Sequence, residues 1–122
     1  MTIPILRQGD ILIASIQVAQ TDADLLKLCD DLARRVGELR SRGVVIDVTA
    51  LDVLDSFATR TLRTIAHTSR LRGANTVVVG IQPDVAFSMV QLGLDLGGIA
   101  TALDLDEALV ELRASLTAGE PP

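Results

Sequence analysis

One serine lies in a setting that suits covalent modification. Ser56 follows Asp55, and apolar residues at helical spacing begin directly after it. A hydroxyl at the start of a helix lies near free backbone N–H groups and the positive end of the helix dipole, which favour a phosphate group. Ser56 is therefore a candidate phosphoacceptor, with Thr59 and Thr64 as secondary candidates. The structural alternatives are that Ser56 caps the helix, or that it lies in the first turn behind Asp55 as the cap.

The carboxylates before this serine offer a second chemistry. Asp47, Asp52 and Asp55 could hold a magnesium ion through their oxygen atoms, as acidic residues do in receiver-type domains. Those domains place an acidic pair near the first strand and a lysine near the last. Here the first strands offer only Asp10, in a turn, and the only lysine is Lys27. We therefore predict no metal and no other cofactor.

The other reactive residue types do not form a catalytic arrangement. His67 is the only histidine and Cys29 the only cysteine. The spacing places His67 on the polar face of one helix and Cys29 in the apolar stripe of another, where a thiol is typically a small buried hydrophobe. Gly97 and Gly98 lack the lysine and the spacing of a phosphate-binding loop. We predict that the chain is not an enzyme; an enzyme that binds a nucleotide or phosphate at the strand ends is the alternative.

Basic residues recur along the helix that Ser56 opens. Arg60, Arg63, His67 and Arg70 follow one another at i, i+3, i+7 and i+10, which places them on one outer face. This basic ridge is either a solvated helix face or a contact for an acidic face of another subunit. Charge complementarity of that kind sets the register and the choice of partner.

The composition is that of one globular domain. The 122 residues are 48% hydrophobic and 22% charged, which provides a core and argues against disorder. The net charge of -5 and the scarcity of aromatic residues argue against binding to duplex or single-stranded nucleic acid. No apolar run approaches the ~20 residues of a membrane span, and no signal-peptide pattern is present. With a single cysteine, these features predict a cytoplasmic protein.

Hydrophobic periodicity predicts elements in the order ββαβαβαβα. Apolar runs without alternation indicate strands covered on both faces, and apolar residues three and four apart indicate amphipathic helices. The expected strands are 3–6, 11–18, 44–48, 75–81 and 97–101, and the expected helices are 22–42, 56–72, 82–92 and 104–116. This order predicts an α/β fold with a mixed, mostly parallel sheet. We expect a single domain over 1–122, with a core over about 3–116 and a flexible tail over 117–122.

Particular residues predict where the helices begin and end. Thr21 is expected to cap the first helix, and Gly43 is expected to follow its end as the left-handed residue. Asp104 and Glu107 resemble a capping box at the start of the last helix. The residues of that helix expected to face inward are Leu105, Ala108, Leu109, Leu112 and Leu116.

These features together resemble STAS domains, the domains of anti-sigma factor antagonists. The resemblance rests on the order of elements and on the segments VVIDVTALDVLDSF, GIQPDVAFSMVQLGL and ATALDLDEAL, and it extends from residue 3 to about 116. It is greatest for the S-type (RsbS-type) scaffold subunit of the bacterial stressosome. The sequence Asp55-Ser56-Phe57 is its most specific part.

The resemblance implies a non-enzymatic scaffold that self-associates and co-assembles with R-type STAS sensor subunits. The complex sequesters a switch serine/threonine kinase, which is released when it phosphorylates the scaffold at Ser56 in a stress response; a serine phosphatase resets the state. Residues near that serine are expected to contact partners, namely Asp52, Asp55, Phe57, Thr59, Arg60 and Arg63. The alternative is a partner-switching antagonist that binds an anti-sigma factor kinase directly, without a large shell.

Overall fold

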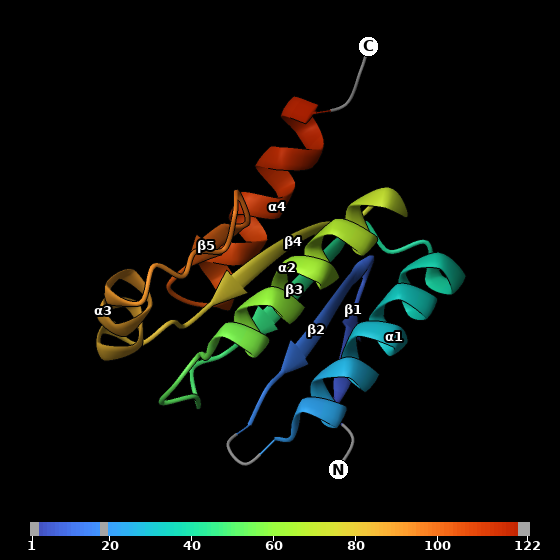
Figure 1. Cartoon of the computed structure of the whole chain (residues 1–122). Helices are drawn as coiled ribbons and strands as arrows, with labels where there is room; N and C mark the ends of the chain where they lie inside the picture. The colour runs from blue at the N-terminus through green and yellow to red at the C-terminus, as the bar shows by residue number, and fades with distance from the viewer. Residues whose placement is uncertain (1–2, 18–19, 120–122) are drawn as a thin grey trace.

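The fold is a five-stranded sheet with helices on both faces (Figure 1). The structure is a computed structural model that describes residues 3–17 and 20–119, with the side chains of the last helix as far as residue 115. The strands are β1 (Ile5–Gln8), β2 (Ile11–Ser15), β3 (Gly43–Asp47), β4 (Asn75–Val79) and β5 (Ala100–Ala102). The helices are α1 (Asp22–Leu39), α2 (Ser56–Leu71), α3 (Pro83–Gln91) and α4 (Leu105–Gly119). The predicted order of elements is confirmed.

The strands are arranged in the order in which they occur along the chain. β1 pairs with β2 in an antiparallel hairpin, and β2, β3, β4 and β5 then pair in parallel. Each crossover moves one strand further in the same direction, and right-handed crossovers therefore bring their helices to the same face. α1 and α2 lie side by side on that face, whereas α4 covers the other (Figure 1).

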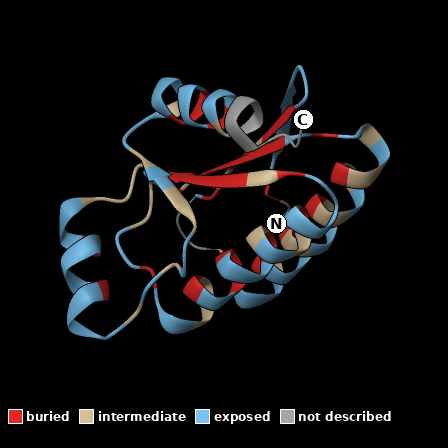
Figure 2. Ribbon diagram, turned by 90° about the horizontal axis from the view of Figure 1, so that it is seen from above, coloured by how far each residue is buried: buried red, intermediate tan, exposed pale blue. Residues whose placement is uncertain are grey.

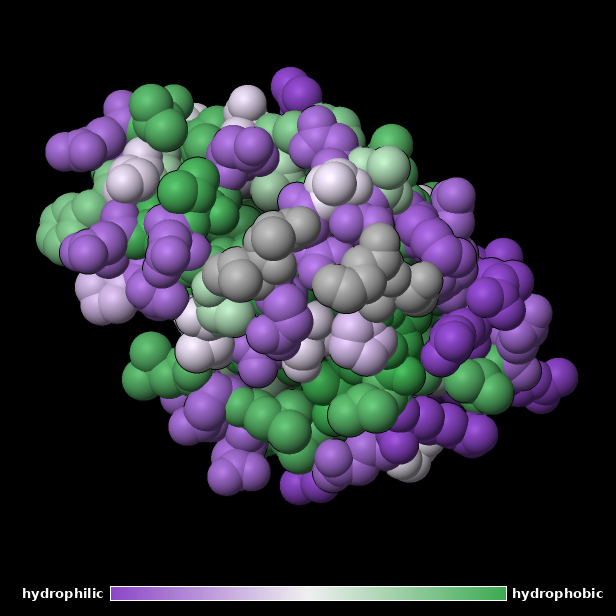
Figure 3. Space-filling model, turned by 90° about the horizontal axis from the view of Figure 1, so that it is seen from below, coloured by the Kyte–Doolittle hydropathy of each residue, from purple (hydrophilic) through white to green (hydrophobic). Residues whose placement is uncertain are grey.

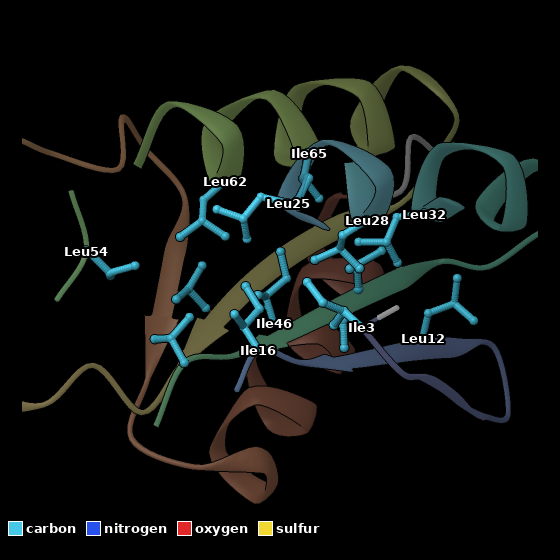
Figure 4. Close-up of a cluster of buried hydrophobic side chains, with 14 of the residues drawn as sticks. Ile3, Leu12, Ile16, Leu25, Leu28, Leu32, Ile46, Leu54, Leu62 and Ile65 are labelled. Atoms are coloured by element: carbon cyan, nitrogen blue, oxygen red, sulfur yellow. The ribbon is translucent and has the colours of Figure 1, made fainter. Parts of the chain in front are cut away.

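The core consists of two layers divided by the sheet. Val44 and Ile46 of β3 belong to the layer beneath α1 and α2, while Val45 between them belongs to the layer beneath α4. All three side chains are fully buried, which explains why this strand shows no alternation of apolar and polar residues. Figure 2 shows the buried strands between helices whose outer faces are exposed, and Figure 4 shows the larger layer.

The start of α1 agrees with the prediction and its end does not. Thr21 Oγ1 accepts a hydrogen bond from the Asp24 N–H at 3.1 Å, and the Thr21 N–H donates to Asp24 Oδ2 at 2.9 Å, which completes a capping box. The residue with positive φ after α1 is Arg40, at 50°, so the prediction for Gly43 is wrong. Gly43 opens β3, where a Cβ would lie 2.9 Å from Leu112 Cδ1. Close packing against α4 explains this glycine.

Several predicted boundaries shift by a few residues. The hairpin strands are β1 at 5–8 and β2 at 11–15, and position 18 lies outside the described residues. β4 ends at Val79, and β5 begins only at Ala100, because Gly97 and Gly98 have φ of 64° and 85° and form a turn. Asp104 Oδ1 accepts from the Glu107 N–H at 2.9 Å, one half of the predicted capping box. α4 continues to Gly119, into the segment predicted as a tail, and the side chain of Leu116 is not described.

Core packing by α2 should dominate the stability of this fold. Leu62 is 1% exposed beneath α2, whereas Leu71 at the end of the same helix is 89% exposed. We expect Leu62→Ala to lower the free energy of unfolding by about 2–5 kcal/mol, through lost apolar burial and the cavity left behind. Leu71→Ala is the matched control and should change it by less than about 0.5 kcal/mol. Chemical denaturation measures both, and equal effects would contradict this account of the core.

Candidate partner-binding and phosphorylation site

The candidate site lies where the parallel strands end. β3 ends at Asp47, residues 48–55 form a connection, and α2 begins at Ser56. In open α/β sheets, the loops beyond the carboxyl ends of the strands usually form the functional surface. Figure 3 views the molecule from this end and shows apolar surface interspersed with hydrophilic side chains.

The connection is held in place by hydrogen bonds. Asp47 Oδ1 accepts from the Thr49 N–H at 2.9 Å and from Thr49 Oγ1 at 2.6 Å. Gln82 Nε2 donates to the Thr49 carbonyl at 2.7 Å, which ties the connection to the start of α3. Gly80 has φ of 80°, and a Cβ there would overlap Thr49 Oγ1. In the described part of the chain, no group of three or more carboxylate, histidine or cysteine side chains is placed to hold a metal ion.

Ser56 is exposed and does not cap α2. It is the first residue of the helix, and the cap is Asp55, whose Oδ1 accepts from the Ala58 N–H at 2.8 Å. The Ser56 hydroxyl makes no hydrogen bond to any residue that the structure describes. Of the two structural alternatives, the structure therefore supports the one in which Asp55 is the cap. The serine hydroxyl is left free for chemistry.

The residues predicted to contact partners differ in exposure. Asp52, Asp55 and Arg60 are exposed, and Phe57 is half-buried against the core. Thr59 is only 2% exposed, and its hydroxyl donates to the Asp55 carbonyl at 2.8 Å. The Thr59 side chain is buried and bonded to the backbone of the helix cap. We therefore count Thr59 neither among the residues that contact partners nor among the phosphoacceptors.

An apolar recess beside the serine was not predicted from the sequence. A cavity of about 160 Å³ lies between α1 and α2 and is lined by Leu25, Leu51, Val53 and Asp55, among others. Val53 is 70% exposed, whereas Leu54 next to it is buried. The signal in the sequence is the adjacent pair of apolar residues Val53 and Leu54, in a connection that is itself largely apolar. Leu54 enters the core, and Val53 remains at the surface, where it can contact a partner.

The basic ridge is exposed along its length, and the secondary phosphoacceptor Thr64 lies beside it. Arg60, Arg63, His67 and Arg70 all lie at the surface. Thr64 is also exposed, and its hydroxyl donates to the Arg60 carbonyl at 3.0 Å within α2. This internal bond gives the Thr64 hydroxyl a partner that the Ser56 hydroxyl lacks.

Cys29 is less buried than predicted. It is half-buried and packs against the core from α1. Burial, with a smaller effect of the Asp30 charge, raises the pKa of the Cys29 thiol. A raised pKa keeps the thiol protonated and disfavours nucleophilic chemistry.

Comparison with known proteins identifies the family. A family model described as the STAS domain matches residues 3–108. The chain belongs to the STAS domain family. A serine-to-glutamate variant of RsbS from Moorella thermoacetica is similar in structure, with 35% identity, a TM-score of 0.80 and coverage of 94% of this chain and 97% of that one.

Two further relatives are a chain from a stressosome structure and a co-antagonist protein. A chain from a structure described as the molecular architecture of the stressosome is 36% identical, with a TM-score of 0.78. The match covers 93% of this chain and 98% of that one. RsbRA of Bacillus subtilis, named as an RsbT co-antagonist protein, is 32% identical over 97 residues. That match covers 70% of this chain but only 35% of RsbRA. This STAS domain is therefore similar to antagonist and stressosome proteins.

Among the residues that the structure describes, every helix is too short or too polar to cross a membrane.

The roles of Asp55 and Ser56 can be separated by stability measurements. We expect Asp55→Ala to lower the free energy of unfolding of this STAS domain by about 1 kcal/mol, because the first turn of α2 loses its cap. Ser56→Ala should change it by less than about 0.5 kcal/mol, because no hydrogen bond is lost. Thermal and chemical denaturation measure both variants. A larger loss for Ser56→Ala than for Asp55→Ala would assign the structural role to the serine.

Proposed function

We propose that this STAS domain is the S-type scaffold subunit of a cytoplasmic stressosome, and that it regulates a stress response without being an enzyme. In this proposal it self-associates, co-assembles with R-type STAS sensor subunits, and sequesters a switch serine/threonine kinase. The kinase is released when it phosphorylates Ser56, and a serine phosphatase restores the binding state. The observation that carries the proposal is that Ser56 is exposed at the start of α2 and leaves the capping to Asp55.

Electrostatics around Ser56 support a switch in binding rather than in folding. A phosphate adds a charge of roughly −1.5 to −2 beside Asp55. The N-terminus of α2 favours that charge by ~0.3–1 kcal/mol. Repulsion from a carboxylate about 4 Å away in water is of similar size, roughly 1 kcal/mol per pair of unit charges. Per unit charge the two effects are of similar size and opposite sign in the free domain, and the net cost is small enough for the fold to tolerate the modification.

A partner seated over Ser56 would respond differently to the phosphate. Exposed Val53 and the apolar recess beside Asp55 are suited to contact apolar side chains of a partner. A contact of this kind excludes water, and a phosphate placed in it meets a desolvation cost of several kcal/mol without a compensating charge. We propose that the kinase contacts this surface through Asp52, Asp55, Phe57 and Val53, and that phosphorylation breaks the contact.

Apolar side chains on α3 support self-association and co-assembly. Phe87 and Val90 are 71% and 77% exposed, although Val85 and Met89 on the opposite side of the helix are buried. Contiguous exposed apolar patches are typical of interaction surfaces. We propose that other subunits cover this face of α3, and that Arg60 and Arg63 on α2 contribute complementary charge to the assembly.

Phosphosite mapping tests the proposal directly. The protein is incubated with the candidate switch kinase and magnesium ATP, and mass spectrometry locates the phosphate. We expect one phosphate, on Ser56, because its hydroxyl is exposed and unpaired whereas that of Thr59 is buried. Ser56→Ala is the control and should remain unmodified. Phosphate on Thr64 or elsewhere in both proteins would contradict the assignment of Ser56.

Kinase capture by a phosphomimetic variant tests the switch. We expect Ser56→Asp to weaken co-purification of the kinase at least about tenfold, through the cost of burying the added charge. Its thermal midpoint should stay within about 2 °C of the wild type, because the electrostatic effects in the free domain nearly cancel. Ser56→Ala, which changes the same residue without adding a charge, is the comparison and should capture the kinase as the wild type does. If Ser56→Asp unfolds the domain, or captures the kinase as the wild type does, the proposed switch is wrong.

A further inference from the structure

A second concave site lies at the other end of α2, away from Ser56. A cavity of about 410 Å³ opens where β5 has not yet begun, beside the first residues of β4. One wall is formed by α2, another by the turn that contains Gly97 and Gly98, and Ser115 of α4 closes the far side. Volumes of ~300–1,000 Å³ are typical of pockets for small molecules. Its position alone does not identify a ligand, but its side chains do.

The ionisable side chains that line this pocket are all basic. Arg63, His67 and Arg70 project from α2, and no carboxylate lines the pocket. Neither arginine forms an ion pair with any carboxylate that the structure describes. In a chain whose net charge is -5, this concentrates unpaired positive charge in a concave surface. Such an arrangement attracts anions, and the guanidinium groups can grip oxygen atoms in pairs.

The turn opposite α2 is shaped to leave room for this basic group. Gly97 has φ of 64°, and a Cβ there would lie 3.1 Å from Arg63 Nε, so the arginine packs closely over the glycine. The nearby carboxylate of Asp95 accepts a hydrogen bond from the Gly97 N–H at 2.7 Å. Asp95 forms no ion pair with Arg63 in the described part of the chain, so the hydrogen-bond donors of the guanidinium are not taken up by this carboxylate.

A buried hydroxyl in the wall of the pocket lacks a partner. Thr76 of β4 lines the pocket and is only 8% exposed, and its Oγ1 has no hydrogen-bond partner among the described residues. Its neighbour Asn75 is satisfied, since Asn75 Nδ2 donates to Ser115 Oγ at 2.9 Å. Buried polar groups are normally paired, and an unpaired one often marks the place of an absent partner. This oxygen is covered by protein in the structure, so its pairing with a ligand oxygen requires rotation of the Thr76 side chain toward the cavity.

We propose that this pocket binds a small organic anion, with its anionic group held by Arg63, His67 and Arg70 and its apolar portion against Leu96 and Ile99. The side chains of Leu96 and Ile99 line the same cavity and are half-buried. A purely inorganic anion would leave these apolar walls in contact with water. A wholly apolar ligand would displace water from the guanidinium groups without offering them hydrogen-bond acceptors in its place. A carboxylate or a phosphate monoester with an apolar body satisfies both surfaces.

An NMR titration with phenyl phosphate, benzoate, inorganic phosphate and phenol tests this proposal. His67 is the only histidine of the chain, so its ring resonances report on the pocket without ambiguity. We expect saturable shifts of the His67 ring and of the Gly97 and Gly98 amides with phenyl phosphate or benzoate. The tighter of these two identifies the preferred anionic group. Inorganic phosphate should bind at least about fivefold more weakly, because it lacks the apolar contact, and phenol should produce no saturable shift.

Matched variants locate the site within the helix. Arg63→Gln with Arg70→Gln should weaken binding at least about tenfold, through lost charge-assisted hydrogen bonds. Arg60→Gln is the control: it removes the same charge from the same ridge, but Arg60 does not line the pocket. It should stay within about twofold of the wild type, since exposed charges at a distance are largely screened by salt.

Thr76→Val separates binding from folding. It keeps the shape of the side chain and removes the unpaired buried hydroxyl, so we expect equal or higher thermal stability with binding weakened about threefold to tenfold. A purely structural threonine would leave binding unchanged. The proposal is overturned if no anion shifts His67 saturably, if inorganic phosphate binds as tightly as phenyl phosphate, or if Arg60→Gln weakens binding as much as the pocket variants.

Discussion

Burial of two neighbouring strands on both faces is the constraint on which the rest of this structure depends. β3 and β4 present apolar side chains to each side of the sheet, with Val44, Val45 and Ile46 fully buried in β3. A strand of this kind is stable only when helices cover both of its faces. α1 and α2 cover one face and α4 covers the other (Figure 1). The connection after β3 is therefore fixed at one end of a rigid layer.

α2 links the core to both candidate sites. Leu62 and Ile65 on its inner side are almost fully buried, which fixes the helix against the sheet. Its first residue is Ser56, and its outer side carries Arg63 and Arg70 into the pocket at the β5 edge. The rise of an α-helix places Ser56 about 15 Å along the axis from the middle of that pocket. The two sites are thus distinct surfaces held in a fixed relation by one packed helix.

Structural and chemical roles are divided between adjacent residues at the start of α2. Asp55 satisfies the free N–H of Ala58, and Thr59 supports the cap from the buried side. Ser56 contributes nothing to these bonds and lies in solvent. Phosphorylation of a residue that makes no structural contact alters the surface and leaves the fold intact, because the packing beneath α2 stays the same. A binding switch on a stable scaffold requires this separation.

Sequence patterns alone determined the order of the elements, the mixed sheet, the cap at Thr21 and the exposed basic ridge, because each of these follows from local spacing and local hydrogen bonding. The position of Ser56 at the start of a helix was predicted in the same way, but its freedom from capping was decided by the backbone geometry around Asp55. Gly43 was misassigned because its constraint is contact with Leu112, a residue far away in the chain. The pocket around Thr76 was also beyond prediction. It joins β4, α2, α4 and the turn before β5, and only tertiary packing decides which distant segments meet.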